Sequence, residues 1–400
     1  MLSLILATTL ALSGEAVAAR VDQQPILAAE VQDQLRGSRG AAASGTPAEA
    51  VDVLAAEVLL AGEAERRGLP KDPAVAAAID AELQRLATER FLAKEVDGAV
   101  RVDEATLREF FHSRADVVRL HEIVVSTEPQ ARAILDRLAK GGSFAAEARN
   151  SLDVRSAPNG GDRGDVARGD LDPALAAAAF QAPIGKVMGP VTLQLGVAVF
   201  KVTARSIGAE QEYAEKRAGL ERFVRQQSAA QMRHHYLTAL RAKGGVKLDE
   251  EFLRGMGARL RPSPEEGRHV LATVNGAPVR YADILPDLLS LSRGIEGGHL
   301  SGPKVKAQVA WSVIDRKLLD GAARQRGFDK DPEVALRRAG ARRMVLARTL
   351  LERLRGGAET APAQRDAAAV KLLDELRAKA RITVDDAVLQ QVATQHVATR

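Results

Sequence analysis

Val117-Val118-Arg119-Leu120-His121-Glu122-Ile123-Val124-Val125 is a run of β-branched residues in a chain otherwise rich in alanine and leucine. β-branched side chains favour strands. Glycine pairs follow at Gly141-Gly142 and Gly160-Gly161, and a second apolar run extends from Gly196 to Val202. The clustered valine and isoleucine residues predict a β-containing insert in this part of the chain.

The rest of the chain has a helical composition. Its 400 residues are enough for two or three domains, and 46% of them are hydrophobic although only 3% are aromatic. Alanine, leucine, glutamate and arginine lose little side-chain freedom in a helix. We therefore predict an α+β protein: mostly helical segments with one inserted domain of β-sheet and helices.

The charge pattern argues against nucleic acid as a partner. The net charge is +5, and acidic and basic residues are interleaved as on solvated helix faces. No basic stripe with interleaved aromatic residues is present. The chain has no cysteine, which excludes disulfides and thiolate metal sites, and its seven histidines are scattered. We expect no metal and no other cofactor.

The first residues have features of an export signal. Leu2 to Leu12 is an apolar run of the right length, and Ala16-Val17-Ala18 has the small-x-small form of a cleavage site. No lysine or arginine precedes the run, so an upstream start and an ordinary buried helix both stay open. No other segment reaches membrane-spanning length, so the mature protein is expected to lack an integral membrane segment.

An internal repeat indicates a duplicated helical element. Residues 59–75 recur at 318–334, at a constant offset of 259, each with a Gly followed by an Asp-Pro pair. Gly68 and Gly327 are expected to end one helix, and Asp72 and Asp331 to cap the next. Thr46-Pro47-Ala48-Glu49 predicts a capping box.

Shorter echoes flank each helix pair. Val21–Ile26 is echoed by Val274–Val279, and residues 240–249 are echoed by 376–385. Each unit is therefore expected to contain an extended entry, a helix pair, a further helix and a short strand. We expect a flexible stretch from Arg36 to Gly45 and a linker from Arg259 to Gly267.

The order and spacing between residues 117 and 206 resemble the PpiC-type parvulin family of peptidyl-prolyl cis-trans isomerases (rotamases). The flanking layout resembles the SurA-type periplasmic chaperones, in which helical segments embrace parvulin inserts. A duplicated helical hairpin that serves only as a core is the alternative for the flanks. The predicted segments are a signal peptide (1–19), an N-terminal helical segment (20–114), a parvulin-like domain (115–206), a helical return (207–258), a linker (259–268) and a second helical unit without an insert (269–400).

The resemblance implies a set of site residues. His121 corresponds to the first core histidine of the family, and Asp153 to the acid or cysteine that faces the substrate carbonyl. The remaining positions implied to bind substrate are Leu171, Asp172, Leu175, Phe180 and Met188, of which Phe180 is also a candidate core residue. Ala198 departs from the family, because it replaces the second core histidine.

The resemblance implies an exported protein-folding factor, acting as an isomerase and chaperone on unfolded or nascent envelope polypeptides with X-Pro segments in the periplasm. Ala198 keeps a second hypothesis open: a non-catalytic holdase or scaffold with a degenerate parvulin domain. A cytoplasmic helical scaffold without export is a third.

Overall fold

The computed structural model describes residues 14–37, 45–292, 302–355 and 362–399. The chain divides into two compact units. The helical unit contains the described residues of 1–98 and 234–400, and the sheet unit contains residues 99–233. The long helix α8 (Glu210–Lys243) contributes residues to both. The predicted class, mostly helical with an inserted sheet domain, is confirmed.

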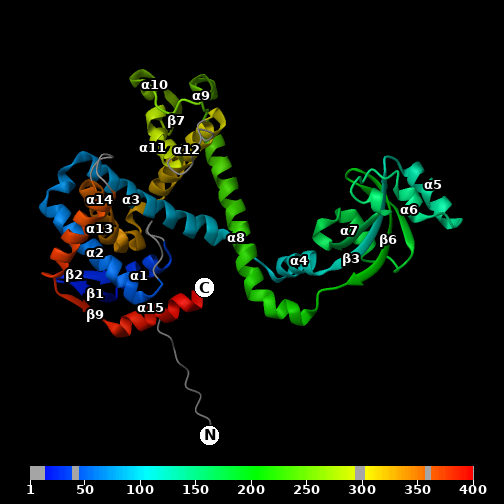
Figure 1. The fold of residues 1–400 in the computed structure, drawn as a ribbon, viewed down its shortest axis with the longest axis horizontal. Coiled ribbons are helices and arrows are strands. Elements are labelled where there is room, and N and C mark those ends of the chain that lie inside the picture. Colours follow the sequence, from blue (N-terminus) through cyan, green and yellow to red (C-terminus); the bar gives the residue numbers. More distant parts are fainter. Residues whose placement is uncertain (1–13, 38–44, 293–301, 356–361, 400) are drawn as a thin grey trace, which may run out of the picture. The chain divides into compact units, whose positions relative to one another are not determined.

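The helical unit begins with a β-hairpin and a helix pair (Figure 1). These elements are β1 (Val17–Val21), β2 (Gln24–Leu27), α1 (Ala28–Leu35), α2 (Pro47–Arg66), the 3₁₀ turn η1 (Leu69–Lys71) and α3 (Pro73–Phe91). α3 is followed by a π-helical turn, η2 (Leu92–Val96), and a 3₁₀ turn, η3 (Asp97–Ala99).

After two short helices, the second half of the helical unit repeats this order from β7 onward. It contains α9 (Glu250–Met256), α10 (Pro264–Arg268), β7 (Val270–Val274), β8 (Ala277–Arg280), α11 (Tyr281–Ser292), α12 (Pro303–Gln325), the 3₁₀ turn η7 (Phe328–Lys330), α13 (Pro332–Arg355), α14 (Pro362–Arg377), β9 (Ile382–Val384) and α15 (Asp386–Thr399).

The predicted helix signals are confirmed. Thr46 and Glu49 form the capping box of α2. Gly68 and Gly327 adopt left-handed backbone angles, with φ of 75° and 76°, which glycine reaches without steric cost. Asp72 caps α3 by accepting a hydrogen bond from the Ala74 N–H. The two helix pairs are therefore ended and restarted by the same local chemistry.

The two repeats close onto each other. β9, at the end of the second repeat, pairs with β1 of the first, with Ala19 opposite Val384 and Val21 opposite Ile382. The equivalent closing segment of the first repeat, residues 246–249, is not a strand, although the Asp249 N–H donates to Leu271 O of β7 at 2.8 Å. Each hairpin is thus completed by residues from the other repeat.

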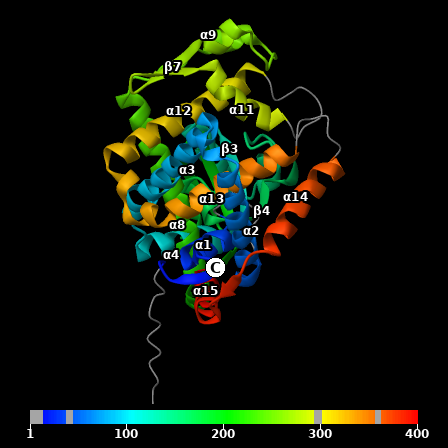
Figure 2. The same ribbon diagram turned by 90° about the vertical axis from the view of Figure 1, so that its left-hand side faces the viewer.

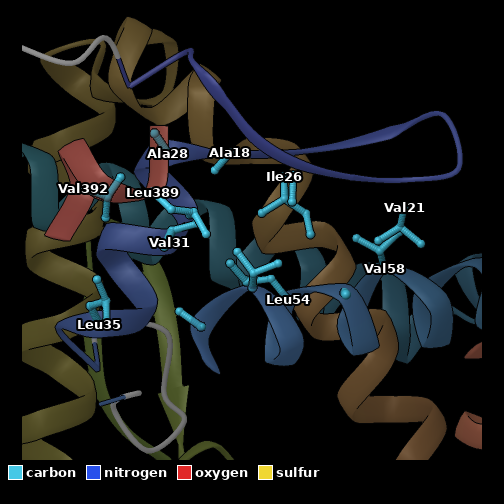
Figure 3. Close-up of a cluster of buried hydrophobic side chains, with 14 of the residues drawn as sticks. Ala18, Val21, Ile26, Ala28, Val31, Leu35, Leu54, Val58, Leu389 and Val392 are labelled. Carbon is cyan, nitrogen blue, oxygen red and sulfur yellow. The ribbon is translucent and has the colours of Figure 1, made fainter. Parts of the chain in front are cut away.

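The helices interlock in the same way. α13 packs against α2 and α3 through a buried cluster that includes Leu60, Ala64, Val345 and Leu350 (Figures 1 and 2). Figure 3 shows the neighbouring cluster, where Leu389 and Val392 of α15 lie beside Val31 of α1. The hydrophobic burial that stabilises the first repeat is therefore supplied in part by the second.

The sheet unit holds a four-stranded antiparallel sheet in the order β4-β3-β6-β5. In chain order its elements are α4 (Glu104–Ala115), β3 (Val117–Val125), α5 (Glu128–Ala139), α6 (Phe144–Ala148), η4 (Ala157–Asn159), β4 (Asp162–Ala167), η5 (Arg168–Asp170), α7 (Pro173–Ala179), β5 (Val187–Leu193) and β6 (Gly196–Ser206). In Figure 1, α7 covers one face of this sheet and α5 and α6 cover the other.

Some predictions concern the segments between these elements. The residues predicted as a linker, 259–268, are ordered and include α10, and Arg259 pairs with Glu266. Residues 2–12 and 38–44 lie outside the described residues, so the export signal and the flexible stretch stay predictions. The predicted cleavage site itself lies in or beside β1: Ala18 is 0% exposed, and its carbonyl oxygen accepts from the Asp385 N–H at 2.9 Å. A chain cleaved before Ala19 would lose this bond, and one cleaved after Ala19 would also lose the pair between Ala19 and Val384. Within the described residues, no helix is long and apolar enough to cross a membrane.

Candidate active site

The two faces of β3 have different roles. Val118 and Leu120 pack under α7, whereas Ile123 and Val125 pack under α5 and α6. Because side chains alternate across a strand, Glu122 shares the α7 face and His121 shares the other. The α7 face of the sheet therefore carries a buried carboxylate.

A pocket of about 920 Å³ opens on the α7 side of the sheet. It is lined from β3, from the loop before η4, from β4, from the turn into α7 and from the β5–β6 turn; its residues include Glu122, Val124, Leu152, Asp153, Arg155, Arg163, Asp170, Leu171, Asp172, Leu193 and Leu195. Leu152 and Leu195 are 55% and 86% exposed, whereas Leu171 is 7% exposed. The pocket thus combines an apolar wall with several charged groups.

Asp153 lies in the pocket lining on the loop between α6 and η4. Burial on its own would raise the pKa of its carboxyl group, but hydrogen bonds from Ser156 Oγ at 2.7 Å and from the Arg155 N–H at 3.2 Å outweigh burial and hold the pKa below its ordinary value. Ser151 Oγ anchors the same loop to the sheet by accepting from the Val124 N–H at 2.9 Å. Asp153 is therefore a fixed anion at neutral pH.

Glu122 and Arg163 form an ion pair in the same lining. Arg163 Nη1 donates to Glu122 Oε2 at 2.6 Å, and the two side chains are 20% and 3% exposed. Burial raises the pKa of the Glu122 carboxyl, because the charged form loses its hydration; the opposing effect of Arg163 is smaller. Asp153 and Asp172 raise it further by repulsion.

Of the seven predicted site residues, the structure brings three together in this pocket: Asp153, Leu171 and Asp172. Asp172 also fixes the local backbone. Its carboxylate accepts from the Ala174 N–H at 2.9 Å as the cap of α7, and from the Gln194 N–H at 3.0 Å. Asp172 therefore ties the start of α7 to the β5–β6 turn across the pocket.

Three more predicted residues lie in the core beside the pocket rather than among its lining residues. Leu175 is 1% exposed and Phe180 is 8% exposed, and both belong to the cluster between α7 and the sheet. Met188 is partly buried against that cluster. Phe180 is also covered by the Arg168 guanidinium, which lies 3.8 Å from the ring centroid. Their roles in substrate binding stay predictions.

His121 does not lie with the other predicted site residues. Its ring faces Phe144 of α6, at 6.2 Å between centroids, on the side of the sheet opposite Glu122. Ala198, which is 0% exposed, lies on β6 opposite Val124 in the cluster under α7. The lining residues of the pocket contain no imidazole. A catalytic role for His121 stays a prediction, and it would have to act without contact with the pocket.

Sequence reasoning missed Glu122 and Arg163. The signal for Glu122 was the two-residue period of the strand, in which Val118, Leu120, Glu122 and Val124 share one face. No comparable signal existed for Arg163, because a β-bulge sets its direction: Leu120 is paired with Gly164 and His121 with Asp162, which leaves Arg163 unpaired.

Comparison with known proteins identifies this part of the chain. Residues 123–204 match the family described as "Rotamase: PPIC-type PPIASE domain". The chain carries a PpiC-type parvulin domain. The matched residues include β4, β5, nearly all of β6, the end of β3, the helices α5 to α7 and every lining residue of the pocket except Glu122.

The parvulin domain also dominates the similarity to individual proteins. The foldase protein PrsA of Caldanaerobacter subterraneus is 34% identical over 106 residues, covering 26% of this chain and 35% of that relative. The chaperone SurA of Chromobacterium violaceum is 36% identical over 90 residues, covering 22% of this chain and 21% of that relative. These matches span well under half of either relative.

Two solved structures are also similar to a part of the chain. A PpiC-type peptidyl-prolyl cis-trans isomerase domain solved at 1.55 Å is 29% identical with a TM-score of 0.23, covering 24% of this chain and 96% of that one. The parvulin domain of PpiD from E. coli is 32% identical with a TM-score of 0.21, covering 24% of this chain and 92% of that one.

Proposed function

We propose that the protein is an exported folding factor whose parvulin domain isomerises X-Pro bonds of unfolded polypeptides. The match of residues 123–204 to the PPIC-type family carries this proposal. The similarity to PrsA foldases and to a SurA chaperone supports a role in protein folding. Envelope proteins in the periplasm are the clients we propose.

The pocket chemistry suits this reaction. Rotation about an X-Pro bond must break amide resonance, which sets a barrier of roughly 20 kcal/mol. A proline ring can rest on the apolar wall of this pocket, which Leu171 shares with the exposed side chains of Leu152 and Leu195. The anionic Asp153 disfavours the planar amide, whose carbonyl oxygen carries partial negative charge, relative to the twisted form. No proton transfer is needed.

A non-catalytic holdase is the second candidate, and Ala198 favours it. The methyl group of Ala198 is buried under α7, so the second core histidine of the family has no counterpart at this position. The helical unit would then bind unfolded chains without accelerating their isomerisation.

A protease-coupled isomerase assay on proline tetrapeptides separates the two candidates. We expect the unmodified protein to accelerate isomerisation, and Leu171→Ala to reduce this rate by weakening the apolar wall. The Ala198→His variant is assayed beside them, with circular dichroism to verify its fold. A rate equal to the uncatalysed one for the unmodified protein would refute the isomerase and favour the holdase.

Export has its own test. Mass spectrometry of the N-terminus, on protein isolated from an envelope fraction, should give a chain that starts at Ala19 or Arg20. Recovery of the intact N-terminus from the cytoplasm alone would contradict export and support the cytoplasmic scaffold.

A further inference from the structure

The bulge on β4 presents one side chain to the pocket. Arg163 is the extra residue between the pairs Leu120–Gly164 and His121–Asp162. Gly161 and Gly164 flank it with φ of 82° and 69°, and a Cβ on Gly161 would lie 2.8 Å from the carbonyl oxygen of Glu122. These glycines allow a backbone shape that ordinary residues resist. Bulges of this kind often re-aim a side chain beside an active site.

The guanidinium of Arg163 is fixed by one hydrogen bond, and that bond uses only one of its N–H donors. In the part of the chain that the structure describes, its one hydrogen bond is the one from Nη1 to Glu122. A guanidinium has five N–H donors in a rigid plane, so the other donors remain available to a ligand. Arg163 lines both the large pocket and an adjoining cavity of about 220 Å³, and Asp153 lines both as well.

A cationic hydrogen-bond donor in this pocket can assist the rotation of an amide bond. In the planar amide the nitrogen lone pair is delocalised into the carbonyl group. As the bond twists, the lone pair returns to the nitrogen, which then accepts a hydrogen bond. A donor that meets this nitrogen only in the twisted form lowers the barrier without tightening the binding of the planar substrate.

We propose that Arg163 is a catalytic residue of the parvulin domain that donates a hydrogen bond to the imide nitrogen of the twisted X-Pro bond, with Glu122 as its positioning residue. This inference rests on the proposed isomerase function. It assigns opposite charges to the two ends of the reacting amide: Asp153 near the carbonyl group and Arg163 near the nitrogen. The lining residues of this pocket contain no imidazole, so the guanidinium of Arg163 is the cationic hydrogen-bond donor that we assign to the reaction.

The test compares steady-state constants of full-length variants on a proline tetrapeptide. We expect Arg163→Met to lower kcat about tenfold or more while KM changes less than about twofold, since a tenfold effect corresponds to about 1.4 kcal/mol. Arg163→Lys should recover part of the loss, because it keeps the charge but not the planar fork. Arg137→Met is the matched control, since Arg137 pairs with Glu147 away from the pocket, with Nε 2.6 Å from Oε1.

A nitrogen-15 NMR titration of the Arg163 Nε–H resonance supplies a readout that a purely structural role would not move. The resonance should shift with a proline tetrapeptide and not with its alanine counterpart. An active protein in which Arg163→Met and Arg137→Met have equal kcat would overturn the Arg163 proposal alone. An inactive unmodified protein would overturn the isomerase proposal together with it, and a folded Arg163→Met variant with higher kcat would overturn the role of Arg163.

Discussion

The N–H of Asp385 donates to the carbonyl oxygen of Ala18 at 2.9 Å, joining the end of the second repeat to the first strand of the chain. The repeat-equivalent bond runs from the N–H of Asp249 to the carbonyl oxygen of Leu271 at 2.8 Å. These two bonds are reciprocal: each closing segment serves the hairpin of the other repeat. The helical unit is thus a single cooperative body made of two interleaved copies.

Interleaving predicts that a change near the C-terminus destabilises the N-terminal hairpin. Leu389 of α15 belongs to the buried cluster of β1, α1 and α2 and is 9% exposed, so Leu389→Ala should lower the free energy of unfolding by about 2 kcal/mol or more. Val397→Ala on the same helix is the control, since Val397 is 75% exposed and its loss should change stability by less than about 0.5 kcal/mol. Urea unfolding followed by circular dichroism measures both. Equal midpoints would contradict the interleaved core.

Glu122 should make the parvulin domain less stable as pH rises. Burial raises the pKa of its carboxyl in the folded protein above the ordinary value of 4.5. Its contribution to stability is therefore complete below about pH 4.5 and is lost as pH rises through the raised folded pKa. Glu122→Gln cannot lose a proton, so the stability of this variant relative to the unmodified protein should increase from pH 4 to pH 7. Thermal unfolding of both proteins at pH 4 and at pH 7 measures this change. A difference in stability that is the same at the two pH values would contradict the raised pKa.

Lys306 should show the opposite dependence. Its side chain is 0% exposed, and Nζ donates to the carbonyl oxygens of Gly257, at 2.6 Å, and Arg259, at 2.5 Å. Burial, together with repulsion by the Arg259 guanidinium, lowers the pKa of its ammonium group from 10.5. The folded protein then releases this proton before the unfolded chain does, so stability should rise with pH between the lowered pKa and about 10.5. Lys306→Met removes this rise, and comparing chemical unfolding of the two proteins at pH 7 and pH 10 isolates it from other groups.

Asp153 should be required as an anion for isomerase activity. Asp153→Asn keeps the shape of the side chain and removes the charge that disfavours the planar amide, so kcat should fall about tenfold, equivalent to about 1.4 kcal/mol, and KM should fall with it. Because the pKa of Asp153 is below its ordinary value, the activity that depends on this group should persist as the assay pH falls to about 5.

The control for Asp153 is Asp165→Asn, on an exposed position of β4 outside the pocket lining, which should leave both kcat and KM unchanged. Equal losses in the two variants would show that general charge, rather than the position of Asp153, determines the rate.

Local chemistry made much of this structure predictable from the sequence. The capping box at Thr46, the left-handed glycines 68 and 327 and the cap at Asp72 each depend on a few neighbouring residues, and each is present. Exchange between the repeats was not predictable, because equivalent closing segments offer nearly the same hydrogen bonds to either hairpin. Only the tertiary packing selects the partner.

The residues of the candidate site also divide into some that the sequence indicated and some that depend on how the strands pair. The loop and turn residues Asp153, Leu171 and Asp172 were implied by the resemblance to the parvulin family, and they line one pocket. Neighbouring residues of a strand point to opposite faces, so the choice between His121 and Glu122 depends on a single position in β3. The direction of the Arg163 side chain depends on a bulge in the pairing of β3 with β4, and such a bulge leaves no periodic pattern in the sequence.

The pairing of β1 with β9 also constrains biosynthesis. Residues 17–21 are synthesised long before residues 382–384, which form the strand beside them. The sheet unit has its own core and can fold once residue 233 has emerged, whereas the hairpin of β1 and β2 stays incomplete until residues 382–384 have been made. During that interval β1 is paired with β2 alone, and its other edge is open to pairing with strands of other chains.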